Sequence, residues 1–304
     1  MIDADEFPAL GALLARQLAV FPEHESYLAR RFKDAQPEHL ALSEDIAGQV
    51  LRIGGDNLDT LLRDYAWLSN VVLAEELHFR RTGSYRLSSF DEAARTIYGD
   101  ALYMSRYMNG LLASQVWWRN HTEALGYYRN VYLASLRSGF RHLEIGPGHG
   151  LFLYQAARDP KCGSLTAWDI SQASLRNTRE ALDAMGVTRP IALQARDLFE
   201  SPRGEFDSLT FSEVLEHLEQ PLAALRILRG LLADGGRLFV NAPVNSPAPD
   251  HIYLFRAPEE IVAMVESAGF EIIDSAFFPT TGASLDRARK HALAISTAIV
   301  ATPC

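Results

Sequence analysis

Residues 140–158 read FRHLEIGPGHGLFLYQAAR, and this stretch decides the fold. A short apolar run ends at Ile145, glycines follow at 146, 148 and 150, and an amphipathic segment begins at Leu151. That order predicts a buried strand, a tight turn and a helix. Glycines in such a turn let a ligand approach the backbone at the N-terminus of the helix. An ordinary strand-to-helix turn is the simpler alternative, because the glycine pattern alone is weak evidence of binding.

The same alternation continues to the end of the chain. Short apolar runs alternate with amphipathic helical segments, and seven of the runs fit as strands between residues 141 and 303. These runs are HLEIG, SLTAWDI, IALQARD, FDSLTFSEV, GRLFVNAP, FEIIDSAFF and ALAISTAIVAT. The alternation predicts an α/β fold, a Rossmann-like, doubly wound, mostly parallel sheet with helices on both faces. No helix signal separates the last two runs, so we expect the seventh strand to be antiparallel.

The front of the chain has a different periodicity. Residues 1–138 show helical spacing almost throughout, which predicts an all-α N-terminal domain. We therefore expect two domains, a helical lid and substrate-specificity domain at 1–138 and a ligand-binding α/β domain at 139–304.

Three local signals predict where helices of the front region begin and end. Asp56 is expected to cap the helix that follows it. Ser89 and Glu92 have the spacing of a capping box. Gly110 and Gly126 are the expected breaks in the proline-free stretch beyond Ser89.

Composition excludes several classes of protein. The chain of 304 residues is 48% hydrophobic and 22% charged, which is typical of a globular protein. Its 29 basic residues face 38 acidic ones, for a net charge of −9, and no basic lobe exists to bind nucleic acid. Two cysteines and no Cys/His metal spacing argue against a disulfide scaffold and a metal site. We expect a soluble cytoplasmic protein without a signal peptide or a membrane partner, because neither a leader pattern nor a long apolar run occurs.

The second predicted strand ends at Asp169, 19 residues after Gly150. A carboxylate at that place can accept hydrogen bonds from both hydroxyls of a ribose. The alternative is a helix cap, a role that Ser171 could fill equally well. A nicotinamide-dependent dehydrogenase would use a similar acidic residue, but its glycine pattern is G-x-G-x-x-G. This turn reads G-x-G-x-G, and Glu144 ahead of it suits a cationic amine better than a pyrophosphate.

Taken in order, EIGPGHG, WDIS, ARDL and SEVLEHL resemble the motifs of class I S-adenosylmethionine-dependent methyltransferases. The final FEIID and AISTAIVA runs extend the resemblance over residues 140–303. It implies a seven-stranded sheet with an antiparallel last strand, and S-adenosyl-L-methionine lying over the first four strand ends.

The resemblance also implies a role for each matching residue. The amino-acid part of the cofactor would be held by Glu144, Gly146, Gly148 and Gly150. Asp169 would bind the ribose, and Ile170 would pack on the adenine. Asp197 would bond the adenine amino group with Leu198 beside it, and Glu213 would lie near the methionine part. The family more often has Asp where this chain has Glu144.

Candidate catalytic residues follow the fourth and fifth strands. His217 lies one turn past Glu213 and could serve as a general base, because imidazole titrates near neutral pH. A structural role for this histidine is the alternative. The proline-rich loop NAPVNSPAPDHIYLF contains Asp250, His251 and Tyr253 where a substrate loop is expected. We expect His217, His251 and Tyr253 as catalytic residues and Asp250 as a substrate contact.

Aromatic residues gather near the end of the helical region. Tyr107, Trp118 and His121 are the candidates for contact with an acceptor, although aromatic stripes at helical spacing are more often core. We expect this region to cap the cofactor site, to select the acceptor and to form a possible homodimer interface.

Three classes of function remain open. The leading hypothesis is methyl transfer to oxygen, nitrogen or carbon of a small molecule, in bacterial secondary metabolism. A second is an elimination or cyclisation that keeps the cofactor without methylating. A third is a non-catalytic partner protein whose helical half binds another chain.

Overall fold

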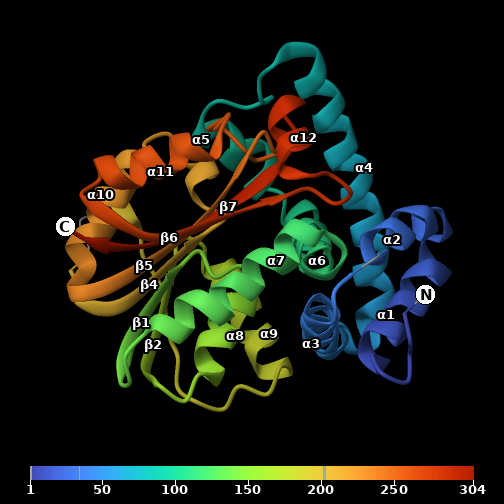
Figure 1. The fold of residues 1–304 in the computed structure, drawn as a ribbon, viewed down its shortest axis with the longest axis horizontal. Helices are drawn as coiled ribbons and strands as arrows, with labels where there is room; N and C mark the ends of the chain where they lie inside the picture. The colour runs from blue at the N-terminus through green and yellow to red at the C-terminus, as the bar shows by residue number, and fades with distance from the viewer. Residues whose placement is uncertain (1, 34, 201–202) are drawn as a thin grey trace.

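A single mixed sheet forms the centre of the molecule (Figure 1). The computed structural model describes residues 2–33, 35–200 and 203–304. The strand order is β3-β2-β1-β4-β5-β7-β6, and β7 is antiparallel to both of its neighbours. The strands are β1 Phe140–Ile145, β2 Cys162–Asp169, β3 Ala192–Ala195, β4 Phe206–Ser212, β5 Leu232–Val244, β6 Phe270–Pro279 and β7 Ile295–Pro303. The predicted seven-stranded sheet and its antiparallel seventh strand are confirmed.

The strand order reverses at β1, in the middle of the sheet. Glu144 of β1 lies in register with Ala167 of β2 on one side and Thr210 of β4 on the other. The connections from β1 and β4 leave in opposite directions, and in sheets of this kind ligands bind at the carboxyl ends of the strands at such a reversal. The loops that follow β1, β2 and β4 are therefore the place to look for a site.

Helices cover both faces of the sheet. α8 Leu151–Arg158 and α9 Gln172–Ala184 lie on one face, and α10 Pro221–Leu231 and α11 Pro258–Ser267 lie on the other (Figure 1). The expectation that no helix separates the last two strands is wrong. A short helix, α12 Leu285–Lys290, begins there at Ser284, whose hydroxyl accepts a hydrogen bond from the amide of Arg287. Six residues are too few to show helical periodicity in the sequence.

The region before β1 is helical, as predicted. Its α-helices are α1 Pro8–Val20, α2 Glu25–Phe32, α3 Pro37–Gly54, α4 Leu58–Thr82, α5 Phe90–Ala93, α6 Ala101–Trp117 and α7 Arg119–Tyr127. Shorter helical turns are η1 Pro22–His24, η2 Gly55–Asn57, η3 Ala94–Tyr98 and η4 Tyr128–Leu133. The capping box at Ser89 is confirmed, since its hydroxyl accepts from the amide of Glu92. Asp56 lies within η2 and does not cap α4, whose N-cap is Asn57.

Gly110 and Gly126 do not break helices, contrary to the prediction. A Cβ at Gly110 would lie 2.7 Å from the side chain of Leu68, and one at Gly126 would lie 2.5 Å from Leu42. The two glycines therefore allow α6 to pack closely against α4, and α7 to pack closely against α3. The chain turns instead at Asp100, whose carboxylate caps α6, and at Trp118.

The helical region and the sheet share one hydrophobic core. Tyr128 and Tyr132 of η4 pack their rings against Phe239 of β5, with centroids 5.0 and 5.4 Å apart. The buried Tyr132 hydroxyl lies 2.8 Å from Ser208 Oγ and donates to the carbonyl of Arg237. Packing thus crosses the predicted boundary at residue 138, and the division into two domains stays a prediction. Within the described part of the chain, no helix combines the length and apolar character that crossing a bilayer requires.

Candidate active site

The glycine turn after β1 has the conformation that its residue type predicts. Gly146, Gly148 and Gly150 have φ angles of 66°, 50° and 76°, in the left-handed region that residues with a Cβ rarely adopt. A Cβ at Gly146 would also lie 3.0 Å from Cγ2 of Val214. The turn therefore depends on glycine at these positions, and it leads directly into the N-terminus of α8.

Glu144 lies at the end of β1, directly before this turn. Its side chain is buried, and Oε2 has no hydrogen-bond partner among the residues that the structure describes. The nearest imidazole nitrogen, Nε2 of His142, is 3.9 Å from that oxygen. Burial raises the pKa of Glu144 well above its usual range. A carboxylate in this position is suited to a cationic group brought by a ligand.

Asp169 ends β2 beside the same turn. Its Oδ1 accepts from the amide of Ser171 at 2.8 Å, and its Oδ2 accepts from the hydroxyl of Ser174 at 2.7 Å. The cap of α9 is Ser171, which accepts from the amide of Ser174, so Asp169 is not needed for that role. Ile170 is 58% exposed and is free to pack on a ligand.

The third strand end is less open. Asp197 Oδ1 accepts from the amide of Phe199 at 2.8 Å, which fixes the turn after β3. Leu198 is buried with the second core cluster, on the face covered by α10 and α11. The roles of both residues toward an adenine stay predictions.

Glu213 follows β4 in a strained conformation. Its φ is 55°, a region that costs a residue with a side chain about 1–3 kcal/mol. Asn241 holds it there, because the Asn241 carbonyl accepts from the Glu213 amide and the Asn241 side chain donates to Glu213 Oε1 at 2.8 Å. Burial raises the pKa of Glu213 to about 7, and the hydrogen bond from Asn241 opposes that shift.

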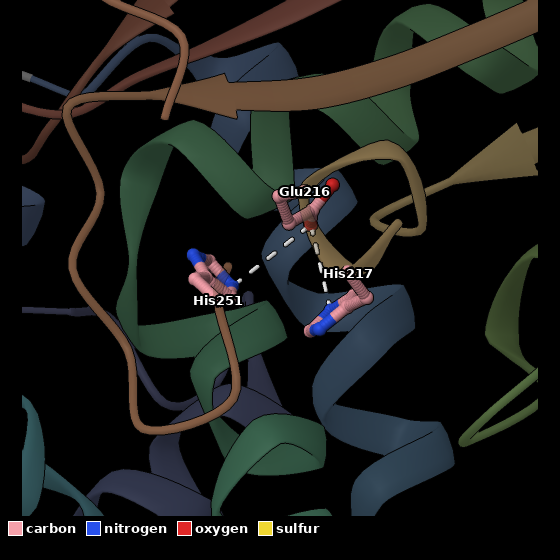
Figure 2. Close-up of side chains that lie close together, drawn as sticks. All are labelled: Glu216, His217 and His251. Carbon is pink, nitrogen blue, oxygen red and sulfur yellow. Dashed lines mark ion pairs between the residues drawn. The ribbon is translucent and has the colours of Figure 1, made fainter. Parts of the chain in front are cut away.

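A histidine–carboxylate cluster lies next to Glu213. Figure 2 shows Glu216 and His217, from the turn η6 Leu215–His217, facing His251 from the loop after β5. Nε2 of His217 and Nε2 of His251 lie 3.8 and 4.0 Å from the same oxygen, Oε1 of Glu216. Glu216 is fully buried, whereas the His217 side chain is 22% exposed. Burial and the neighbouring Glu213 raise the pKa of Glu216 well above its usual range.

Two tyrosines of the helical region contact Asp250, which lies beside this cluster. The Tyr107 hydroxyl donates to Asp250 Oδ1 at 2.7 Å, and the Tyr98 hydroxyl donates to Oδ2 at 3.3 Å. Burial opposes ionisation of Asp250, but His217, His251 and the Tyr107 hydrogen bond together lower its pKa. The helical region thus contacts the loop after β5 directly.

Two further predicted acceptor contacts, Trp118 and His121, and the predicted catalytic Tyr253 have other partners. Trp118 donates from Nε1 to the Tyr65 hydroxyl at 3.1 Å, a hydrogen bond within the core of the helical region. His121 Nδ1 lies 3.0 Å from the Ser114 hydroxyl, and burial lowers the pKa of His121 to about 3. Tyr253 packs its ring on Phe255, with centroids 4.7 Å apart. The structure brings Tyr107, His217, Asp250 and His251 together, while the roles of Trp118, His121 and Tyr253 stay predictions.

Sequence reasoning missed three residues of the site. Glu216 is directly before His217 in SEVLEHL and could have been noticed, since a carboxylate beside a histidine is a common functional pair. Tyr98 and Asn241 carried no signal, because their roles depend on partners 119 and 28 residues away.

The comparisons with known proteins agree with this geometry. Residues 143–238 match the family model described as a methyltransferase domain. The match runs from β1 into β5, so this part of the chain, with its glycine turn, is similar to a methyltransferase domain.

Two ubiquinone biosynthesis O-methyltransferases are similar in sequence. That of Xanthomonas axonopodis pv. citri (strain 306) is 29% identical over 157 residues, which is 45% of this chain and 65% of the relative. That of Xanthomonas campestris pv. campestris (strain B100) is 31% identical over 140 residues, which is 43% of this chain and 58% of the relative. The chain therefore spans less than two thirds of the length of these relatives.

Solved structures show the fold over more of the chain. Mitomycin 7-O-methyltransferase has a TM-score of 0.54 at 16% identity, covering 82% of this chain and 71% of that one. An O-methyltransferase from neocarzinostatin biosynthesis, in complex with S-adenosylmethionine and 2-hydroxy-5-methyl naphthoic acid, has a TM-score of 0.54 at 15% identity, covering 77% and 69%. In both comparisons the matched part of this chain is longer than the region from β1 to β7. The likeness of fold therefore extends into the N-terminal helices.

Proposed function

We propose that this protein transfers a methyl group from S-adenosylmethionine to a hydroxyl oxygen of a small molecule. The observation that carries the proposal is the meeting of three features at one sheet edge. These features are the glycine turn after β1, the strained Glu213 after β4, and the histidine–carboxylate cluster beneath Tyr98 and Tyr107.

The residues around the glycine turn fit the cofactor. Glu144 offers a buried carboxylate oxygen without a partner, which a cationic amino group would satisfy. Asp169 uses each oxygen for one bond to α9 and keeps further lone pairs for a ribose. S-adenosylmethionine would supply an already activated methyl group on a sulfonium. The task of the chain is then to align the acceptor and to exclude water.

The contacts of the cluster suggest how the chain would treat an acceptor. Tyr107 and Tyr98 hold Asp250, and the Asp250 carbonyl accepts from Nδ1 of His217. The Ser246 carbonyl accepts from Nδ1 of His251, so both histidines have fixed orientations. Methyl transfer to a hydroxyl requires that its proton leave, and this cluster is the place in the site that can receive it. We propose that Trp118, His121 and Tyr253 line the more distant wall of the acceptor pocket.

Sequence relatives and fold neighbours support oxygen as the acceptor atom. The relatives carry names of O-methyltransferases, and two fold neighbours are O-methyltransferases of mitomycin and neocarzinostatin biosynthesis. We propose an acceptor that combines a hydroxyl with an aromatic or apolar body, because Tyr98, Tyr103 and Tyr107 border the cluster. A biosynthetic role and a homodimer through the helical region remain parts of this proposal.

The test is product analysis with methyl-labelled cofactor and a panel of hydroxylated aromatic and aliphatic acceptors. We expect label on an oxygen of at least one acceptor, with the label lost in Glu144→Gln and kept in the control Asp234→Asn, an exposed surface residue. Conversion of an acceptor without transfer of label would contradict methyl transfer and would instead support the elimination or cyclisation alternative.

A further inference from the structure

We propose that Glu216, His217 and His251 bind a divalent transition-metal ion at the acceptor end of the site. One ligand atom from each residue lies within 4.8 Å of the others (Figure 2). The ion would occupy the site of the proposed methyl transfer, but its binding does not depend on that reaction. Spacing in the sequence did not predict it, because His251 comes 34 residues after His217.

Both imidazoles are oriented as metal ligands are. Nδ1 of His217 lies 3.1 Å from the carbonyl oxygen of Asp250, and Nδ1 of His251 lies 2.6 Å from that of Ser246. A carbonyl oxygen only accepts, so each Nδ1 carries its hydrogen and each neutral ring keeps a lone pair on Nε2. Histidines that bind metals typically donate the other ring N–H to a carbonyl or carboxylate in this way.

The third residue supplies a carboxylate without partners. Glu216 is fully buried, and neither of its oxygens has a hydrogen-bond partner among the described residues. The Nε2–Oε1 separations of 3.8 and 4.0 Å are too long for hydrogen bonds. Two metal–ligand bonds of about 2.1 Å can bridge up to about 4.2 Å, so one ion can join both nitrogens to this oxygen.

Local charge also favours a cation. Glu216 and Asp250 are buried carboxyl groups and Glu213 lies beside them, so a cation would offset the cost of burying them in ionised form. A proton shared between Glu213 and Glu216 is the competing explanation. That proton would leave the two Nε2 lone pairs without a partner, whereas a metal ion would use all three groups.

The donor set indicates which ions fit. Two imidazoles and one carboxylate suit Zn²⁺, Mn²⁺, Fe²⁺, Co²⁺ or Ni²⁺ better than Mg²⁺, which prefers oxygen ligands. Three protein ligands leave coordination positions open for water or an acceptor hydroxyl. The partly exposed His217 side chain provides a route of entry from solvent.

The test is metal binding by the full chain after treatment with a chelator. Zn²⁺ titration by calorimetry and the visible absorption bands of Co²⁺ are measured without cofactor or acceptor. We expect one equivalent of either ion per chain. Loss of an outer partner costs metal sites 10–100-fold in affinity, so loss of a ligand in His251→Ala or Glu216→Gln should cost at least about 100-fold.

A matched control is His39→Ala, which removes a histidine 3.6 Å from the carboxylate of Glu123 in another part of the fold. It should leave the metal affinity unchanged, and unfolding curves should show that all variants are folded. If His251→Ala is misfolded, His217→Gln replaces it. The proposal is overturned if the folded wild-type chain binds neither ion stoichiometrically, or if both ligand variants bind it like the wild type.

The outcomes also separate this proposal from methyl transfer. Label transfer that persists in metal-free protein would leave the proposed function standing, and the Co²⁺ titration alone would then decide the metal site. Stoichiometric Co²⁺ binding without any label transfer would support the metal site and count against the function.

Discussion

Replacing Gly146 by alanine tests whether the glycine turn binds the cofactor or is only an ordinary turn. The φ angle of Gly146 is 66°, and its new Cβ would lie 3.0 Å from Cγ2 of Val214. The left-handed conformation alone costs alanine about 1–2 kcal/mol. We therefore expect a loss of about 1–2 kcal/mol in the free energy of unfolding, with a small further loss from the contact with Val214.

Gly186→Ala is the matched control for backbone strain. Gly186 has a φ of 79°, and a Cβ there would meet nothing within 4 Å. It lies beyond the C-terminal end of α9, whereas Asp169 and Ser171 lie before its N-terminal end. Gly186→Ala should lose a similar 1–2 kcal/mol of stability, because it carries the same conformational cost.

The two variants should differ in ligand affinity. Urea unfolding gives the stability of each, and calorimetric titration with S-adenosylhomocysteine gives the dissociation constant. Gly146→Ala should bind at least about tenfold more weakly, or 1.4 kcal/mol, because its tight contact with Val214 shifts the backbone of the turn proposed to hold the cofactor. Gly186→Ala should bind like the wild type. Equal affinities in the two variants would refute a binding role for the turn.

Three further predictions concern stability and the acceptor. Tyr132→Phe removes the hydroxyl that donates to the carbonyl of Arg237, so urea unfolding should show a loss of about 1–2 kcal/mol with unchanged cofactor affinity. Tyr107→Phe removes the 2.7 Å bond to Asp250 and should raise the acceptor KM about tenfold without changing cofactor affinity, as steady-state kinetics would show. Burial lowers the pKa of His24 from 6.5 to about 4, because the folded state favours the neutral imidazole. The free energy of unfolding therefore decreases as the pH falls from 6.5 toward 4, where the unfolded chain binds a proton that the folded chain does not. That loss should reach about 3 kcal/mol, and unfolding of His24→Gln between pH 7 and pH 4 should show a shallower decline than the wild type.

The architecture of the sheet could be predicted because its signals are local. Each strand is a short apolar run, and the segment after each run is amphipathic, so alternation alone indicates a doubly wound sheet. The left-handed φ angles of Gly146, Gly148 and Gly150 follow equally from residue type. Ser89 and Ser171 cap the helices that follow them by the same local logic.

Features that depend on distant partners could not be predicted. Gly110 and Gly126 looked like helix breaks, but Leu68 and Leu42 from other helices pack against them, and no local pattern reveals that. The sequence places Glu216 beside His217, but only the folded chain shows that its carboxylate is buried without a hydrogen-bond partner among the described residues. The cluster likewise required the β5 loop to bring His251 to Glu216.

Calorimetric titration of the folded chain with S-adenosylmethionine, alongside Asp169→Ala, tests whether the carboxyl ends of β1, β2 and β4 bind this cofactor. We expect one site per chain in the wild type and at least about a tenfold loss of affinity in the variant, since Asp169 would no longer bond the ribose. Absence of binding by the folded wild-type chain, or equal affinity in the variant, would contradict this expectation.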